Sequence, residues 1–259
     1  MDIEITIDEG VQVIRLTRPE KKNALLGAMY DAMSQALDRG EREEGIVAHI
    51  FIGSGGSFSA GNDINDFVRR AQAGEGAIPT PSLDFIRRLP RVTKPMIAAV
   101  DGLAIGVGTT LLFHCDLVYA TPQASLRTPF LDLGLVPEAA SSLLAPQRMG
   151  YQRAFEMLCL GEAFDGQRAY EAGIVNKVVA LDALEATAME AARKLAAKPP
   201  GALAAARRLV RGDIEPITAR IEEEARVFGE RLTSAEAREA FAAFFEKRKP
   251  DFSGLKRAG

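Results

Sequence analysis

A single carboxylate, Glu138, stands out because of its neighbours. It ends the stretch Leu133–Glu138, Leu-Gly-Leu-Val-Pro-Glu, and the sequence Ala-Ala-Ser-Ser follows. A carboxylate can remove or return a proton during catalysis. The local pattern equally predicts a glutamate in the first turn of a helix, where Pro137 precedes it and the helix dipole stabilises its charge. Judged locally, this structural interpretation is favoured.

Two glycine-rich segments, Gly53–Asp63 and Gly106–Leu111, are the second chemical feature. They lack the lysine of a phosphate loop, the third glycine of a dinucleotide fingerprint and the Gly-x-Ser-x-Gly pattern of a serine hydrolase. Glycines after a strand leave backbone N–H groups accessible, and two such loops facing each other would form an oxyanion hole. On spacing alone, two tight strand-to-helix turns are the favoured interpretation.

The histidines and cysteines point to no further chemistry. His49 falls in an apolar strand and His114 in an apolar helix, so both are expected to be packed core residues. Cys115 and Cys159 lie in apolar surroundings and form no CxxC pair. The sequence therefore predicts no metal site.

Strand and helix patterns alternate through about residue 180, which favours an α/β core. Beyond residue 182 the pattern is helical, with a break at Pro199-Pro200. We expect a core at 1–198 and a helical segment at 199–259. The predicted elements are a hairpin over 3–16, strands over 46–52, 95–100 and 117–119, and helices over 29–40, 82–89 (capped by Ser82), 106–113, 184–197, 202–210, 217–232 and 235–249.

The composition of the chain limits the classes of function that it can have. The chain has 259 residues, with 32 basic and 35 acidic side chains and a net charge of −3, which disfavours nucleic-acid binding. The N-terminus lacks a signal-peptide pattern, and the apolar run Met96–Phe113 contains Asp101 and three glycines. We expect a cytoplasmic protein that does not enter a membrane. The basic end of the chain is either a solvated tail or a site for the phosphates of an anionic ligand.

Several ordered motifs, spread over essentially the whole chain, resemble the crotonase (enoyl-CoA hydratase/isomerase) superfamily. They are Leu16–Pro19 with Asn23–Leu25, Phe58–Ile64, Lys94-Pro95, Asp101–Gly108, Cys115–Ala120 and Phe244–Arg248. The resemblance implies a spiral of repeated ββα units with a C-terminal helical segment that mediates trimers, so a homotrimer or a dimer of trimers is expected.

The resemblance also implies acyl-CoA thioester substrates, with coenzyme A as part of the substrate and no separate cofactor. It assigns the two oxyanion donors to the backbone N–H groups of Asn62 and Val107. The positions that it carries over as coenzyme A or substrate contacts are Lys22, Ala24, Ala60, Asp63, Ile64, Phe130, Phe228, Phe244 and Lys247.

Departures from the family pattern bear on the reaction. Where the family's hydratases carry two glutamates, this sequence has Thr110 and Phe130. Glu138 instead falls where the Δ3,Δ2-enoyl-CoA isomerases carry their single catalytic glutamate, and an apolar pocket should raise its pKa. Isomerisation is therefore the leading hypothesis. The alternatives are a hydratase in which Asp132 replaces a missing carboxylate, isomerisation of a ring-opened or epoxide acyl-CoA, and a catalytically silent acyl-CoA-binding protein.

Overall fold

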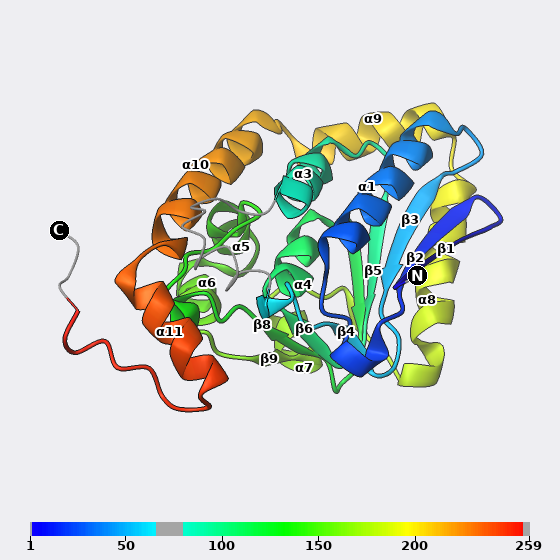
Figure 1. Cartoon of the computed structure of the whole chain (residues 1–259). Coiled ribbons are helices and arrows are strands. Elements are labelled where there is room, and N and C mark those ends of the chain that lie inside the picture. The colour runs from blue at the N-terminus through cyan, green and yellow to red at the C-terminus, as the bar shows by residue number, and fades with distance from the viewer. Residues whose placement is uncertain (1, 66–79, 256–259) are drawn as a thin grey trace.

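The computed structural model describes residues 2–65 and 80–255, and it has a mixed α/β architecture built on two sheets (Figure 1). The strands are β1 (Ile3–Asp8), β2 (Val11–Leu16), β3 (Ala48–Ile52), β4 (Ser57–Ser59), β5 (Met96–Val100), β6 (Leu103–Ile105), β7 (Leu117–Ala120), β8 (Ser125–Arg127), β9 (Phe164–Asp165) and β10 (Lys177–Val178). The α-helices are α1 (Gly27–Arg42), α3 (Thr80–Arg88), α4 (Val107–Thr110), α5 (Ser141–Met149), α6 (Tyr151–Leu158), α7 (Gly166–Glu171), α8 (Leu181–Ala196), α9 (Pro200–Arg211), α10 (Glu215–Leu232) and α11 (Ala235–Phe245).

The strands are divided between two sheets in a repeating way. The larger sheet has the order β1-β2-β3-β5-β7-β10, and the smaller one has the order β4-β6-β8-β9. Along the chain, β3, β5 and β7 enter the larger sheet, and β4, β6 and β8, which follow them, enter the smaller one. Neighbouring strands within each of these two sets of three run parallel. A helix follows each pair of strands, so the expected spiral of ββα units is confirmed.

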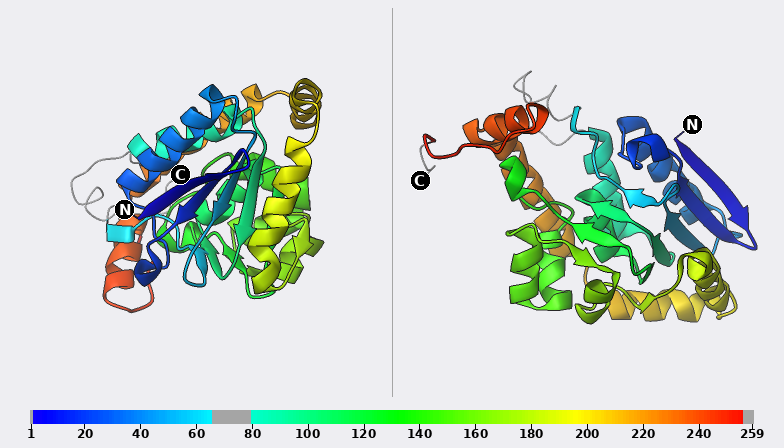
Figure 2. Two further views of the ribbon diagram at one scale, coloured as in Figure 1. Left: turned by 90° about the vertical axis from the view of Figure 1, so that its right-hand side faces the viewer. Right: turned by 90° about the horizontal axis from the view of Figure 1, so that it is seen from below.

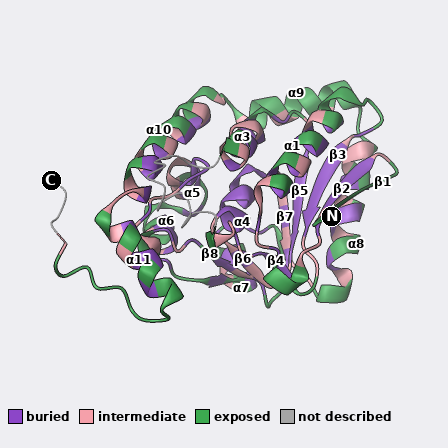
Figure 3. Ribbon diagram, viewed as in Figure 1, coloured by how far each residue is buried: buried purple, intermediate pink, exposed green. Residues whose placement is uncertain are grey.

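Helices cover both faces of the larger sheet. Apolar side chains of α1 and α3 pack on one face, in a cluster that includes Met33, Phe51 and Phe85. On the other face, Ile50 and Ile97 pack against Ala188 and its neighbours in α8. Figure 2 shows α1 and α8 on opposite sides of the sheet, and Figure 3 shows that the strands between them are buried. Burial on both faces explains why Ala48–Ile52 and Met96–Val100 are continuously apolar.

The C-terminal helices pack against the core. Phe228 of α10 and Phe241 of α11 form an apolar cluster with Phe130 and Leu135 of the core. The hairpin β1–β2 lies at the opposite end of the molecule from α10 and α11 (Figure 1). The break between α8 and α9 falls at 197–199, close to the boundary expected from the sequence. The C-terminal segment therefore packs on the side of the core that carries Phe130 and Leu135.

The element boundaries differ from the sequence predictions at several places, and three of these differences bear on the site or its surroundings. Ser82 does not cap its helix, because α3 already includes Thr80 and Ser82 is buried within it. Glu138 does not lie in the first turn of a helix, because α5 begins at Ser141. The last helix ends at Phe245, and Lys247 then has a left-handed backbone (φ 53°). Among the described residues, no helix is long and apolar enough to span a membrane.

Candidate active site

A cavity of about 650 Å³ lies between the core and the C-terminal helices. Its lining comes from the two glycine-rich loops, from the segment that carries Phe130 and Glu138, and from Phe228 of α10 and Phe244 of α11. Segments that are far apart in the sequence therefore meet around one space. The wall is mostly apolar, which suits an acyl chain and disfavours a charged carboxylate.

Glu138 is the buried acid of this cavity. Its side chain is 4% exposed, and the Thr110 hydroxyl donates a hydrogen bond to Oε1. Oε2 has no hydrogen-bond partner in the described part of the chain. Burial raises the pKa of Glu138 to about 8; the Thr110 hydrogen bond acts against the rise, and the nearby charge of Glu224 adds to it. A carboxyl group with this pKa can both accept and return a proton near neutral pH.

A left-handed turn directs Glu138 away from the following helix. Ala139 and Ala140 both have positive φ angles, 59° and 56°, and α5 begins only after them. A non-glycine residue in this region costs about 1–2 kcal/mol. The sequence pattern Pro-Glu-Ala-Ala carries no glycine to signal such a turn, which explains why Glu138 was expected inside a helix.

The secondary structure around Asn62 and Val107 supplies no acceptor for their backbone amides. Leu25 donates to the Gly61 carbonyl at 2.8 Å and accepts from the Asp63 amide at 3.0 Å, so this parallel bridge uses the peptides on either side of Asn62. In a parallel pair, the N–H of the residue between them points away from the partner. Val107 is the first residue of α4, where an N–H has no acceptor within the helix. Both residues line the cavity.

Glycine allows the two loops to approach each other closely. Gly61 has φ +81°, and a Cβ atom there would lie 2.7 Å from the Ile105 carbonyl oxygen. The Gly106 amide donates to the Arg127 carbonyl at 2.8 Å, which anchors the second loop to the smaller sheet. The glycines thus bring Asn62 and Val107 to one side of the same cavity.

Most of the residues expected to bind coenzyme A or substrate line this cavity. They are Ala24, Ala60, Asp63, Ile64, Phe130, Phe228 and Phe244, in addition to Glu138, Asn62 and Val107. Lys22 and Lys247 are not among the lining residues, whereas the adjacent Lys21 and Arg248 are. Lys22 and Lys247 each have a left-handed backbone after a helical turn (φ 51° and 53°). Lys22 and Lys247 were carried over from the family resemblance, and their contacts stay a prediction.

Two other carboxylates at the cavity are paired with arginines. Asp63 accepts a hydrogen bond from Arg18 at 3.0 Å, and both side chains are largely buried. Asp132 accepts one from Arg127 at 2.9 Å, and its side chain is 54% exposed. These carboxylates differ from Glu138, whose one side-chain partner within the described ranges is the Thr110 hydroxyl group.

Two residues near the cavity were missed by the sequence analysis. The Tyr30 hydroxyl, from α1, donates to Oδ1 of Asn62 at 2.5 Å. Burial and the charge of Glu138 raise the pKa of Tyr30 well above its usual value. Glu224, from α10, is 6% exposed and accepts the Ala140 amide at 2.6 Å. Helical spacing in the sequence marks Tyr30 as a core residue and Glu224 as one of many surface charges.

The two histidines and Cys115 are buried core residues, and Cys159 is partly buried. His49 and His114 are buried, and burial lowers their pKa values to about 4 and about 3. Burial raises the pKa of the Cys115 thiol to about 12, which keeps it in the unreactive protonated form. Within residues 2–65 and 80–255, no group of three or more His, Cys, Asp or Glu side chains is placed to hold a metal ion.

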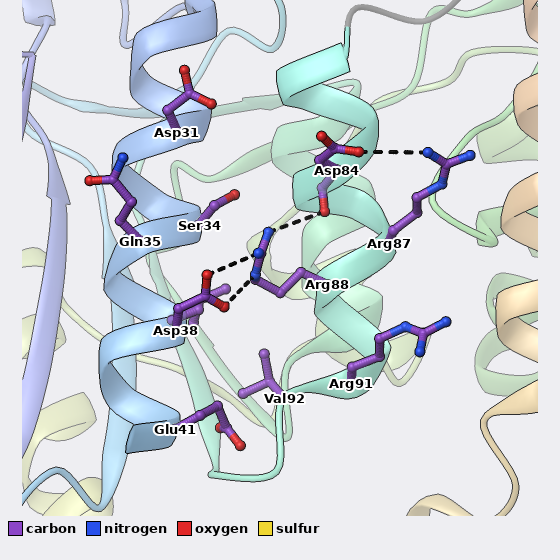
Figure 4. Close-up of a pocket in the computed structure, with 11 residues that line it drawn as sticks. Asp31, Ser34, Gln35, Asp38, Glu41, Asp84, Arg87, Arg88, Arg91 and Val92 are labelled. Carbon is purple, nitrogen blue, oxygen red and sulfur yellow. Dashed lines mark hydrogen bonds and ion pairs between the residues drawn. The ribbon is translucent and has the colours of Figure 1, made fainter. Parts of the chain in front are cut away.

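A second hollow lies between α1 and α3, and it has a structural explanation (Figure 4). Arg88 of α3 crosses it and donates to both carboxylate oxygens of Asp38 in α1, at 2.7 and 2.9 Å. On its outer side, Arg87 pairs with Glu222 of α10 at 2.6 Å. These ion pairs join α1 to α3 and α3 to α10, and they account for the polar lining of the hollow.

Comparisons with known proteins agree with the fold and the site. The model of the enoyl-CoA hydratase/isomerase family matches residues 6–256, and the chain belongs to this family. A probable enoyl-CoA hydratase of Bacillus subtilis (strain 168) is 33% identical over 258 residues, covering 97% of this chain and 98% of that protein. Enoyl-CoA delta isomerase 2 of Rattus norvegicus is 32% identical over 250 residues, which is 95% of this chain but 64% of the rat protein.

A solved structure supports the same conclusion. The enoyl-CoA hydratase/isomerase of Pseudoalteromonas atlantica T6c superposes with a TM-score of 0.91 and 37% identity, covering 98% of this chain and all of that chain. The relatives carry both hydratase and isomerase names. The chemistry of this particular chain must therefore be argued from its own residues.

Proposed function

We propose that this protein is a Δ3,Δ2-enoyl-CoA isomerase in which Glu138 moves the proton and the amides of Asn62 and Val107 stabilise the thioester oxygen. The observation that carries the proposal is the placement of Glu138. It is a buried carboxyl group with a raised pKa and a free oxygen, on the same cavity as two accessible amides.

The reaction needs one base and one site for negative charge. The Glu138 carboxylate removes a proton from C2 of a 3-enoyl thioester, and the electron pair of that C–H bond moves into a conjugated dienolate. The charge on the thioester oxygen is held by the two amide N–H groups, each worth about 2.7–4 kcal/mol to the transition state. The protonated Glu138 then returns the proton to C4, and the double bond now joins C2 and C3.

Hydration is the second candidate, and Asp132 is the residue that could support it. Asp132 lines the cavity, so a second carboxylate is present. Because Asp132 is paired with Arg127 and is exposed, it is favoured as a stable anion at the rim of the cavity. It is less suited to donating or accepting a proton inside the cavity. Phe130, which lines the cavity where the family's hydratases carry a glutamate, has no proton to transfer. These features favour isomerisation over hydration.

Binding of the coenzyme A portion is assigned to the rim of the cavity. Lys21 supplies positive charge there for the phosphates, whereas the charge of Arg248 is already paired with Glu239 and Glu246. Ala24, Ala60 and Ile64 offer backbone and apolar contacts. Lys22 and Lys247, which adjoin Lys21 and Arg248 in the chain, remain predicted contacts. A silent acyl-CoA-binding protein would share the same rim, but it would have no use for a buried carboxyl group with a raised pKa.

A panel of thioesters tests the proposal. Purified protein is incubated separately with 3-enoyl-CoA, 2-enoyl-CoA and 3-hydroxyacyl-CoA in water labelled with ¹⁸O. We expect the 3-enoyl ester to give the 2-enoyl ester without ¹⁸O uptake. Rapid formation of a labelled 3-hydroxyacyl product would instead identify a hydratase. Tight binding of all three esters without turnover would identify a silent binding protein.

A further inference from the structure

We propose that Glu224 of α10 is a positioning residue for Glu138: it anchors the left-handed turn after the acid and sets the electrostatic environment of the carboxyl group. This inference deepens the proposed function and rests on it, because it assigns to the C-terminal segment a part in controlling the acid as well as in lining the cavity.

The contacts of Glu224 converge on the turn. One carboxylate oxygen accepts the Ala140 amide at 2.6 Å. The other accepts the Ser142 amide at 3.0 Å and the Ser142 hydroxyl at 2.5 Å. Arg220, one turn earlier in α10, donates to the same hydroxyl at 3.0 Å. A buried carboxylate from a distant helix thus satisfies the amide groups at the start of α5.

The turn depends on an anchor of this kind. Ala139 and Ala140 are both left-handed, a backbone conformation that is unfavourable for residues with a Cβ atom. The N-cap residue of α5, Ala140, makes no side-chain cap. Hydrogen bonds to a charged acceptor are stronger than those between neutral groups. Glu224 therefore offsets the strain that keeps Glu138 facing the cavity, two residues before the first anchored amide.

Glu224 also acts on Glu138 through its charge. Burial raises the pKa of Glu224, and its hydrogen bonds and Arg220 act against that rise. When Glu224 is ionised, its negative charge disfavours ionisation of Glu138. The other groups around this pair are Tyr30 of α1, whose hydroxyl stays protonated, and His114, which is neutral and contacts the Ala139 carbonyl at 2.8 Å.

The proton affinity of Glu138 can be measured without turnover. Carboxyl groups of glutamate-labelled protein are titrated by ¹³C NMR, and the Glu138 signal is assigned by its loss in Glu138→Gln. In Glu224→Gln we expect the Glu138 titration to move to lower pH, because the neighbouring charge is gone. Glu224→Asp keeps the charge, so the titration should stay near that of the wild type. Glu230→Gln, an exposed charge of the same helix, is the matched control and should change nothing.

Kinetics separate positioning from binding. In Glu224→Gln and Glu224→Asp the anchor is weakened, and we expect kcat on a 3-enoyl-CoA to fall by about 10²-fold, as for a displacement of ~1 Å in a reacting group. KM should change little, because the proposed coenzyme A contacts lie at the rim. If Glu224→Gln does not fold, Ser142→Ala removes one donor to Glu224 and should lower kcat in the same direction.

The outcomes distinguish the two proposals. An unchanged Glu138 titration in Glu224→Gln, together with unchanged kcat there or in Ser142→Ala, would overturn the role of Glu224. A purely structural cap would lower the melting temperature without moving the titration, and this result also counts against the inference. If Glu138→Gln keeps full activity, the proposed function fails, whereas the NMR result on Glu224 still stands.

Discussion

At the scale of single residues, the environment of Glu138 predicts a distinct pH dependence. The base must be ionised to remove a proton, and burial raises its pKa to about 8. We therefore expect kcat/KM for a 3-enoyl-CoA to rise as pH increases, with a midpoint near 8 in the free enzyme. Initial rates between pH 5.5 and 9.5 check this. A rate that is constant from pH 5.5 upward would contradict the assignment of a buried base.

The same pKa predicts an effect on stability. The folded protein holds a proton on Glu138 more tightly than the unfolded chain does, so the contribution of this group to stability falls as pH rises from about 4.5 to about 8. Glu138→Gln removes this dependence. The melting temperature of the variant should exceed that of the wild type, by more at pH 8 than at pH 5. One kcal/mol corresponds to about 2–4 °C in a chain of this size. An equal difference at both pH values would contradict the prediction.

Tyr30 should matter through Asn62. Tyr30→Phe removes the hydroxyl that holds the half-buried Asn62 side chain, and such a hydrogen bond contributes about 0.5–1.5 kcal/mol to stability. We expect a lower melting temperature and a kcat reduced by about tenfold, equivalent to ~1.4 kcal/mol in the barrier. Tyr151→Phe is the control, because Tyr151 is 66% exposed. Equal kcat in the two variants would exclude a part for Tyr30 in holding the oxyanion loop.

At the scale of elements, the close approach of the two glycine loops can be tested at Gly61. In Gly61→Ala the added Cβ would lie 2.7 Å from the Ile105 carbonyl oxygen, and the residue would keep a positive φ. The loops must separate, so both kcat and the melting temperature should fall. Gly56→Ala is the matched control: its φ is +74°, but no heavy atom lies within 4 Å of the added Cβ. If both variants lose activity equally, backbone strain alone accounts for the effect.

The sequence predicted the elements whose signal is local. Continuous apolar runs such as Met96–Val100 identified the buried strands. The spacing of the glycine segments favoured two tight turns, and only the family resemblance assigned these loops, which line the cavity, to the site. The sequence predictions failed where the local structure depends on contacts between residues that are far apart in the chain. The turn after Glu138 needs Glu224 from α10, and Ser82 is buried within a helix that begins earlier. The family resemblance, carried by many short motifs, identified most of the residues that line the cavity.

At the scale of the whole molecule, helix α9 leaves an apolar surface uncovered. None of its residues is buried, and Leu209 and Val210 are 77% and 88% exposed (Figure 3). Surfaces of this kind mark contacts with other chains. We therefore retain the prediction of a trimer or a dimer of trimers. Light scattering at micromolar concentration should give three or six times 27.9 kDa, and a mass of 27.9 kDa would contradict it.

The whole molecule also explains why the site needs the C-terminal segment. Phe228 and Phe244 complete the cavity wall, and Glu224 reaches the turn beside the acid. These residues are separated from Glu138 by 86 or more positions, and no local pattern connects them to it. The family resemblance assigned Phe228 and Phe244 to the site, whereas nothing in the sequence predicted the contact that Glu224 makes with the turn.

The most direct test of the account compares wild type and Glu138→Gln on a 3-enoyl-CoA under identical conditions at pH 8. Glutamine nearly matches the shape of glutamate but cannot accept the proton from C2. We expect the wild type to form the 2-enoyl thioester readily. In the variant, the isomerisation rate should fall by about 10²–10⁴-fold, which is the usual contribution of a general base. Comparable rates for the two proteins would contradict the central claim.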